Sequence, residues 1–149
     1  MLAAGWAVRG TSRREESLAA IEAAGIEAAL ADPDRVGTVL ELVGDVAVVF
    51  HLLGSADGDS EAVAAIHGPR LERLMEKVVD TPVRGVVYEG VGSVDDAVLA
   101  GGAEIVGTAS RTWRIPAEIV TSEPNDPAER SQRMVDLALG LLSPARATK

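Results

Sequence analysis

The sequence contains no cysteine, and lysine, tyrosine and histidine are scarce. The absence of cysteine excludes disulfide bonds, thiolate chemistry and zinc or iron–sulfur centres with cysteine ligands. Lysine occurs only at Lys77 and Lys149, tyrosine only at Tyr88, and histidine only at His51 and His67. Much of the acid–base and nucleophilic chemistry that enzymes use is therefore excluded or confined to a few positions.

The sequence also lacks long apolar runs and an excess of positive charge. No apolar run approaches the roughly 18–20 residues of a membrane-spanning helix, and no basic segment followed by an apolar one marks a secretory signal. The net charge of −9 argues against a nucleic-acid-binding surface, which requires a basic face. With 149 residues, 47% apolar and 25% charged, the chain has the composition of one globular domain. We expect a single cytoplasmic domain over residues 1–149 that binds neither membranes nor nucleic acid.

Short β-rich runs alternate with longer helical runs along the whole chain. Helices are predicted over residues 15–24, from Asp32-Pro33 onward, over 61–80, over 93–111 and from Asp126-Pro127 onward. Strands separated by helices of this length form parallel sheets through right-handed crossovers. The sequence therefore predicts a three-layer α/β fold with a doubly wound parallel sheet of about five strands, at residues 6–10, 26–30, 46–53, 83–88 and 115–121.

Several local signals refine this prediction. Residues 46–53 form a continuous apolar run that is typical of a central strand buried on both faces. The Gly68-Pro69 pair predicts that the 61–80 segment either kinks or divides into two helices, with Pro69 opening the second. Ser93 is the expected N-cap of the following helix. The adjacent glycines at 101 and 102 indicate either close packing of that helix or a break in it.

The first five residues, Met1 to Gly5, resemble the last turn of a helix with a glycine cap. Five residues do not form a stable helix alone, because nucleation is costly. This favours the hypothesis that the chain is an N-terminally shortened version of a longer protein. The alternative is a disordered lead-in.

Three segments, LAAGWAVRGTSRR, GIEAALADPDR and DVAVVFHLLGSA, resemble the second, third and fourth strands of NAD(P)-binding Rossmann proteins. The similarity is to the atypical and extended short-chain dehydrogenase/reductases, including the NAD-dependent epimerase/dehydratase group. It extends from Leu2 to about Leu142, and its motifs are short but stand in the family's order and spacing.

The resemblance implies a cofactor-binding role for nine residues. Arg13 matches the position at which NADP-binding members contact the 2′-phosphate, and no acidic residue of the NAD-preferring kind occurs between Ala7 and Arg14. Asp32 with Pro33 matches the adenine contact, and the segment after the 46–53 strand matches the loop under the nicotinamide ribose. NADP is therefore the expected cofactor, with NAD less favoured, and the implied cofactor-binding set is Thr11, Ser12, Arg13, Asp32, Pro33, Leu52, Leu53, Gly54 and Ser55.

Two family features are missing from the sequence. The first strand and its G-x-x-G-x-x-G turn, which hold the pyrophosphate, do not occur, and we interpret Gly90 and Gly92 as loop flexibility. The catalytic Tyr-x-x-x-Lys pair is impossible, because Gly92 stands four residues after Tyr88. A phenol without a neighbouring lysine keeps a pKa near 10 and is a poor acid or base at neutral pH. No catalytic residue is therefore assigned.

The missing first strand also affects the expected order of the sheet. Removing strand 1 from the family order 3-2-1-4-5-6 leaves 3-2-4-5-6. If the gap closes, the order becomes 2-1-3-4-5, as in flavodoxin-like folds. If it stays open, two strand edges are exposed at the centre, which favours aggregation or dimerisation.

The candidate sites allow a structural interpretation as well as a functional one. The Gly10–Arg14 turn is suited to a phosphate through its hydroxyls and guanidiniums, or it is a capping box of Ser12 with Glu15. His51 is expected to be a buried neutral histidine with a hydrogen-bonded ring, and His67 is expected to pack at a helix surface or helix end. Neither histidine has partners at metal-ligand spacing, so no metal site is predicted.

Together these observations favour an NAD(P)-binding Rossmann-type domain that is related to epimerase-like oxidoreductases and is weak or inactive in this form. Its partner would be a dinucleotide or a small phosphate ligand. Two alternatives remain open at this stage: a non-catalytic structural or interaction domain, including a homodimer, and a flavodoxin-like phosphate-binding protein.

Overall fold

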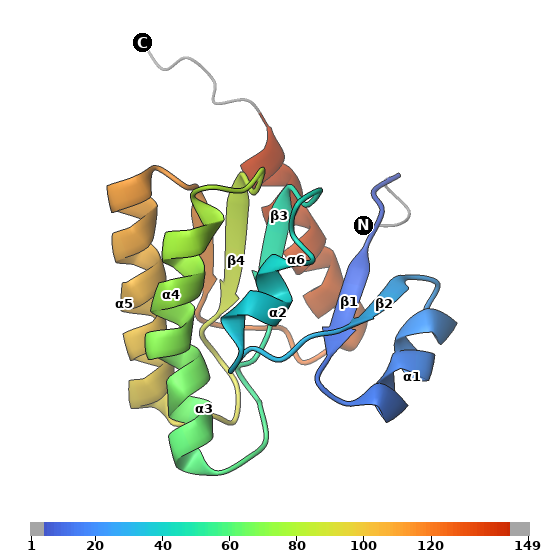
Figure 1. The fold of residues 1–149 in the computed structure, drawn as a ribbon, viewed down its shortest axis with the longest axis horizontal. Helices are drawn as coiled ribbons and strands as arrows, with labels where there is room; N and C mark the ends of the chain where they lie inside the picture. The colour runs from blue at the N-terminus through green and yellow to red at the C-terminus, as the bar shows by residue number, and fades with distance from the viewer. Residues whose placement is uncertain (1–4, 144–149) are drawn as a thin grey trace.

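The computed structural model describes residues 5–143, which form parallel strands alternating with helices (Figure 1). The elements follow the predicted alternation. In chain order they are β1 (Arg9–Ser12), the 3-10 turn η2 (Glu15–Ser17), α1 (Leu18–Ala23), β2 (Glu27–Leu30), α2 (Val36–Leu40), β3 (Val48–His51), α3 (Ser60–His67), α4 (Pro69–Val78), β4 (Gly85–Glu89), α5 (Asp96–Trp113), β5 (Ala117–Val120) and α6 (Pro127–Leu142).

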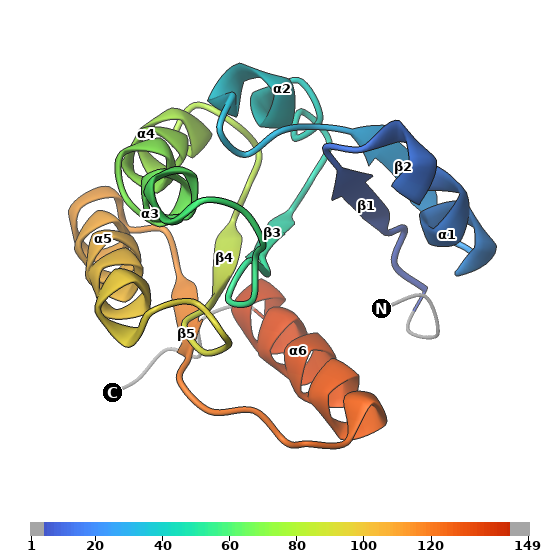
Figure 2. The same cartoon turned by 90° about the horizontal axis from the view of Figure 1, so that it is seen from below.

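The strands form two parallel sheets, β1-β2 and β3-β4-β5. In both views β1 lies beside β3, with β2 and β4 on their far sides (Figures 1 and 2). The α/β class and the parallel strands are confirmed. The gap expected from the missing first strand could either close or stay open. It stays open, because β1 and β3 are not hydrogen-bonded to each other.

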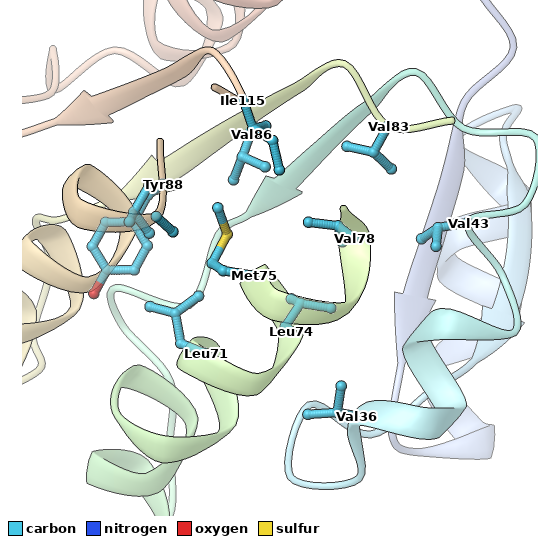
Figure 3. Packing of buried hydrophobic residues seen from close by; sticks show 12 residues of the cluster. Val36, Val43, Leu71, Leu74, Met75, Val78, Val83, Val86, Tyr88 and Ile115 are labelled. Atoms are coloured by element: carbon cyan, nitrogen blue, oxygen red, sulfur yellow. The ribbon is translucent and has the colours of Figure 1, made fainter. Parts of the chain in front are cut away.

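Helices cover both faces of the three-stranded sheet. Figure 2 shows α3, α4 and α5 on one side and α6 on the other, while α1 lies against β1 and β2. The main core lies between α4 and the sheet (Figure 3). Its most buried members come from α4, β4 and α5, and each is at most 2% exposed: Leu71, Met75, Val78, Val86, Tyr88 and Val106.

The expected central position of the 46–53 segment is wrong. Strand β3 pairs with β4 on one side only, and most of it is half-buried. The central strand is β4, whose first four residues are buried. The apolar run of β3 is suited to a strand with neighbours on both sides, but no described strand pairs with the edge that faces β1.

Helix boundaries confirm some of the local predictions and correct others. Gly68-Pro69 separates α3 from α4, and Asp126 caps α6 by accepting a hydrogen bond from the Ala128 amide at 3.2 Å. The N-cap of α5 is Asp95, not Ser93, because the Asp95 carboxylate accepts from the Ala97 amide at 2.9 Å. The helix is continuous through its two glycines, so the expected break is wrong, and the close-packing interpretation is correct for Gly102 but not for Gly101.

The chain ends fall largely outside the described residues. The interpretation of residues 1–5 as a helix end falls mainly on residues 1–4, which, like residues 144–149, the structure does not describe. Gly5 itself has a φ of +85°, a left-handed conformation that glycine adopts without strain. Among residues 5–143, no helix is both long and apolar enough to cross a membrane.

Candidate functional site

The predicted cofactor residues lie at the carboxyl ends of β1, β2 and β3. Thr11 and Ser12 end β1, and Arg13 follows directly. The Ala31 amide donates to the Ser12 carbonyl at 3.0 Å, so the β1–β2 pairing continues to the residue before Asp32. The segments 11–13 and 32–33 are therefore neighbours. In parallel α/β sheets this is the edge at which ligands bind.

Arg13 connects the end of β1 with the loop that follows β3. Its guanidinium donates to the Asp57 carbonyl at 3.5 Å, which is a long hydrogen bond at an exposed position. Among the described residues, no carboxylate forms an ion pair with Arg13. The side chain thus keeps donors available for an anion at the open end of β1.

The capping box between Ser12 and Glu15 does not form. The Ser12 hydroxyl accepts instead from the Arg14 amide at 3.1 Å. Residues 15–17 make a 3-10 turn whose N-cap, Arg14, provides no side-chain hydrogen bond. The hydrogen bond between Ser12 and the Arg14 amide consequently holds the turn at 10–14. Thr11 and Arg13 are exposed.

Asp32 and Pro33 form a turn before α2, not the first turn of a helix. The Asp32 carboxylate accepts from the Asp34 amide at 2.9 Å, and the Thr38 hydroxyl accepts from the Asp32 amide at 2.9 Å. These contacts delay the helix, which starts at Val36. One oxygen of Asp32 is thus used by the turn, and the other makes no hydrogen bond to a described residue.

The 52–55 loop packs tightly against the loop after β4. A Cβ at Gly54 would collide with the carbonyl oxygen of Val91, and one at Gly92 would collide with the Gly54 carbonyl. The Ser55 hydroxyl accepts from the Ser93 amide at 3.1 Å. Gly92 has a φ of +149°, so it allows a close backbone approach. The interpretation of Gly92 as loop flexibility is therefore wrong.

Within the 52–55 loop, Leu52 is exposed, whereas Leu53 is half-buried and Gly54 is buried. Leu52 is 48% exposed, whereas the Leu53 carbonyl lies 2.8 Å from the His67 Nε2 atom. A ligand reaching this loop would therefore contact Leu52 more readily than Gly54, whose surroundings are filled by protein backbone.

Gly90 is also a position of close contact. A Cβ there would lie 3.1 Å from the Val120 carbonyl oxygen, and the Gly90 amide donates to that carbonyl at 2.8 Å. Both glycines after β4 therefore position the loop beside the 52–55 segment and the end of β5.

A carboxyl pair that we did not predict lies at the same edge of the sheet. Glu89 ends β4 and accepts from the Gly54 amide at 2.8 Å. Burial, and then the neighbouring Glu123 carboxyl, raise the pKa of Glu89 to about 7. One oxygen of Glu123 is buried without a hydrogen-bond partner, and its other oxygen is 4.0 Å from Arg130. A proton on Glu89 would give that buried oxygen a donor.

The single tyrosine and both histidines form one buried group. The ring centroids of His51, His67 and Tyr88 lie 5.3 to 5.7 Å apart. Since the Leu53 carbonyl accepts from His67 Nε2, the other ring nitrogen, Nδ1, accepts from the Tyr88 hydroxyl at 2.7 Å. Gly102 on α5 makes room for this hydroxyl. The group connects β3, α3, β4 and α5.

Burial determines the protonation of this group. It raises the pKa of Tyr88 to about 12 and lowers the pKa of His51 to about 4, with the neighbouring His67 as a second cause. His51 is buried and neutral, as expected, but the expected hydrogen bonding of its ring is not found at the Nδ1 atom, which is buried without a partner among the described residues. His67 ends α3, as expected for packing at a helix end, but it is only 1% exposed, so the surface alternative is wrong. The phenol has a higher pKa than the value near 10 that the sequence suggested.

Sequence reasoning missed Glu89, Glu123 and the contact of His67 with Tyr88. Glu89 had a readable signal, because it stands at the carboxyl end of a predicted strand. The other contacts join residues far apart in the chain and had no such signal. Among residues 5–143, no group of three histidine, aspartate or glutamate side chains is arranged to hold a metal ion.

Comparisons with known proteins identify a fold but no family. No family model matches the chain, and no curated protein matches it. Among solved structures, it is similar to a triphenylmethane reductase from Citrobacter sp. that was solved in complex with NADP(H), with a TM-score of 0.55 and 16% identity. The match covers 74% of this chain and 38% of the reductase. The chain therefore spans well under half of that protein, and at this identity the similarity shows a Rossmann-like fold alone.

Proposed function

We propose that this chain is an NAD(P)-binding domain of the oxidoreductase type that takes NADP at the carboxyl ends of β1, β2 and β3. The observation that carries the proposal is that the 11–13, 32–33 and 52–55 segments all follow the carboxyl ends of parallel strands, with Arg13 linking the end of β1 to the loop after β3. The similar Citrobacter reductase was solved with NADP(H), which supports a nicotinamide dinucleotide as the ligand.

The described residues suit one half of NADP better than the other. Arg13 carries exposed donors for the 2′-phosphate and Thr11 adds a hydroxyl, while Asp32 keeps one carboxylate oxygen for the adenine. The loops at Gly54 and Gly92 do not offer an open row of backbone amides for a pyrophosphate, because the two glycines are packed against each other. We therefore expect the adenosine 2′-phosphate to provide most of the binding energy. NADP, when bound in a complete site, supplies hydride-transfer chemistry.

We assign no catalytic role to Tyr88. Its hydroxyl is engaged with His67 inside the core, and its pKa of about 12 makes it a weak proton donor or acceptor at neutral pH. This supports a binding role over ordinary short-chain dehydrogenase chemistry for these residues.

A thermal-shift titration tests the proposal, because a ligand that binds only the folded state raises the melting temperature. The probes are NADP, NAD, 2′,5′-ADP and FMN. We expect NADP and 2′,5′-ADP to produce similar shifts, both larger than the shift with NAD. Arg13→Ala should remove the difference, because a charge-assisted contact to phosphate is lost. Arg14→Ala, which changes the adjacent exposed arginine, should preserve it.

The pattern of shifts separates the alternatives. A response to FMN without a response to NADP would favour a flavodoxin-like phosphate-binding protein. No response to any of the four probes would reject nucleotide binding and favour a structural or interaction domain.

A further inference from the structure

The strand order decides which way a dinucleotide extends from Arg13. Among the described strands, β2 pairs only with β1, and both views place β3 on the other side of β1 (Figures 1 and 2). The Arg13 guanidinium donates to the Asp57 carbonyl in the loop after β3 at 3.5 Å. A dinucleotide whose 2′-phosphate binds Arg13 therefore gains further contacts with the protein by extending over this loop toward the end of β4.

The loop after β3 presents an apolar side chain and fixes its own backbone against β4. Leu52 is 48% exposed and offers a surface for a flat ring. The Gly54 amide donates to the Glu89 carboxyl group at 2.8 Å, and the Gly54 carbonyl accepts from the Val94 amide at 3.0 Å. Glu89 is thus bonded to the same loop on which the second half of a dinucleotide would rest.

Glu89 belongs to a cluster of charged side chains from three elements. Glu123 lies between β5 and α6, and one of its oxygens is 4.0 Å from Arg130 on α6. The other Glu123 oxygen is buried without a hydrogen-bond partner among the described residues. A proton on Glu89 gives that oxygen a donor, while the second oxygen of Glu89 still accepts from Gly54. The two carboxyl groups therefore either share one proton or carry two negative charges.

The number of protons sets the net charge of this cluster. With one shared proton, the remaining carboxylate is balanced by Arg130, and without it the cluster carries one net negative charge. Burial, and then Glu123, raise the pKa of Glu89 to about 7. The change of charge therefore falls between pH 6 and pH 8.

The other groups around Glu89 do not add a charge in this interval. The loop after β3 contributes the Gly54 amide, and the loop after β4 brings the Val91 carbonyl close to Gly54. His67 binds the same loop at the Leu53 carbonyl, but burial lowers the pKa of His67, so the ring is neutral above pH 7. Glu89 is consequently the group whose charge changes beside the loop.

A charge at this place distinguishes the two oxidation states of the cofactor. The nicotinamide ring carries one positive charge in NADP⁺ and none in NADPH, and the remaining parts of the two molecules are the same. A negative charge near the ring attracts the oxidised form and leaves the reduced form unaffected. A neutral cluster has no such preference.

We propose that Glu89, together with Glu123, makes the ligand edge selective for oxidation state, so that the fully ionised pair favours NADP⁺ over NADPH and the singly protonated pair does not. This inference rests on the proposed function, because it takes Arg13 as the anchor of the 2′-phosphate. Glu89 acts here through its charge, and we assign it no proton transfer to a substrate.

The test measures dissociation constants of NADP⁺, NADPH and 2′,5′-ADP by isothermal titration calorimetry of the full chain at pH 6, 7 and 8. A phosphate monoester titrates near pH 6, but the 2′-phosphate does so in both dinucleotides, and the ratio of their constants cancels it. We expect the NADPH constant divided by the NADP⁺ constant to rise by about three- to ten-fold from pH 6 to pH 8, the size of one interaction between unit charges near a protein surface. The probe 2′,5′-ADP has no nicotinamide and reports the Arg13 anchor alone.

Three variants assign the rise to Glu89. Glu89→Gln keeps an acceptor for the Gly54 amide but has no charge to lose, so the ratio should not change with pH. Glu123→Gln should move the rise to lower pH, because the neighbouring carboxyl is one cause of the raised pKa of Glu89. Asp57→Asn removes an exposed carboxylate from the same loop and should preserve the rise. Circular dichroism melts establish that each variant folds.

The outcomes separate this inference from the proposed function. Binding of all three probes with a ratio that is constant from pH 6 to pH 8 would overturn the role of Glu89 and leave nucleotide binding intact. A rise that persists unchanged in both Glu89→Gln and Glu123→Gln would also overturn it. Failure of both NADP⁺ and 2′,5′-ADP to bind would reject the proposed function, and this inference with it.

Discussion

At the scale of single residues, the two adjacent glycines of α5 have different roles. A Cβ at Gly102 would collide with the Tyr88 hydroxyl and lie 2.6 Å from its Cζ atom, whereas nothing lies within 4 Å of a Cβ at Gly101. Gly102 thus allows the Tyr88–His67 contact to form beneath the helix. Gly101 provides no contact and only weakens the helix.

This difference predicts opposite effects of the same substitution. Gly102→Ala should destabilise the fold by about 1–3 kcal/mol, because an added methyl group forces buried side chains to shift. Gly101→Ala should stabilise it by up to about 1 kcal/mol through helix propensity. Urea denaturation measures both. Equal effects at the two positions would show that Tyr88 does not pack against Gly102 in solution.

At the scale of elements, the sequence was informative wherever the signal was local. Pro69 and Asp126 marked helix starts correctly, because a cap or a fixed φ acts within a few residues. Ser93 failed because Asp95, two residues later, makes the capping bond. The 46–53 run was recognised as a strand, but its place in the array depends on pairing with distant segments, which composition does not encode.

The candidate site shows the same limit. The positions of Arg13 and Asp32 at strand ends were predictable from the order of elements. The filled surroundings of Gly54 were not, because they depend on the loop after β4 approaching within contact distance. The position of Glu89 at a strand end was also readable, but its contacts with Gly54 and Glu123 were not, because they join distant segments.

The Glu89 carboxyl connects three elements in a pH-dependent way. It accepts from Gly54 after β3 and lies beside Glu123 in the segment between β5 and α6, where Arg130 faces Glu123. Burial first, and Glu123 second, raise its pKa to about 7 in the folded state from an ordinary 4.5. The folded chain therefore binds more protons than the unfolded chain between these values. Stability from this group is complete below about pH 4.5 and is lost as pH rises through 7.

Glu89→Gln should remove this dependence. The amide keeps an acceptor for Gly54 and gives the buried Glu123 oxygen a donor without a proton exchange. We expect the variant to be more stable than the wild type at pH 8 and to lose that advantage at pH 5, measured by urea denaturation. The same difference in stability at both pH values would contradict the shifted pKa.

At the scale of the whole molecule, the structure combines a well-packed half with an open one. The helices on both sides of β3-β4-β5 enclose the core (Figure 2). Strands β1 and β2 are covered by α1, and Arg9 and Arg13 connect them to the segments before and after β3. Exposed ion pairs such as Arg9–Asp45 contribute little to stability. The proposed ligand edge involves the half that is held less firmly.

The packed half depends on a neutral buried histidine, which predicts sensitivity to acid. His51 is 7% exposed, and burial, together with the nearby His67, lowers its pKa to about 4 from an ordinary 6.5. The unfolded chain therefore binds more protons between these values. Stability from a neutral His51 is complete above about pH 6.5 and falls as pH decreases toward 4, by roughly 3 kcal/mol at about 1.4 kcal/mol per pKa unit.

The contribution of Glu89 to stability changes with pH in the opposite direction over part of this range, so Glu89→Gln is the background in which to measure the effect of His51. In that background, His51→Leu should flatten the decline between pH 6.5 and 4.5, whereas replacing the exposed Asp57 by asparagine should not change it. An equally steep decline with leucine at position 51 would place the acid sensitivity elsewhere in the chain.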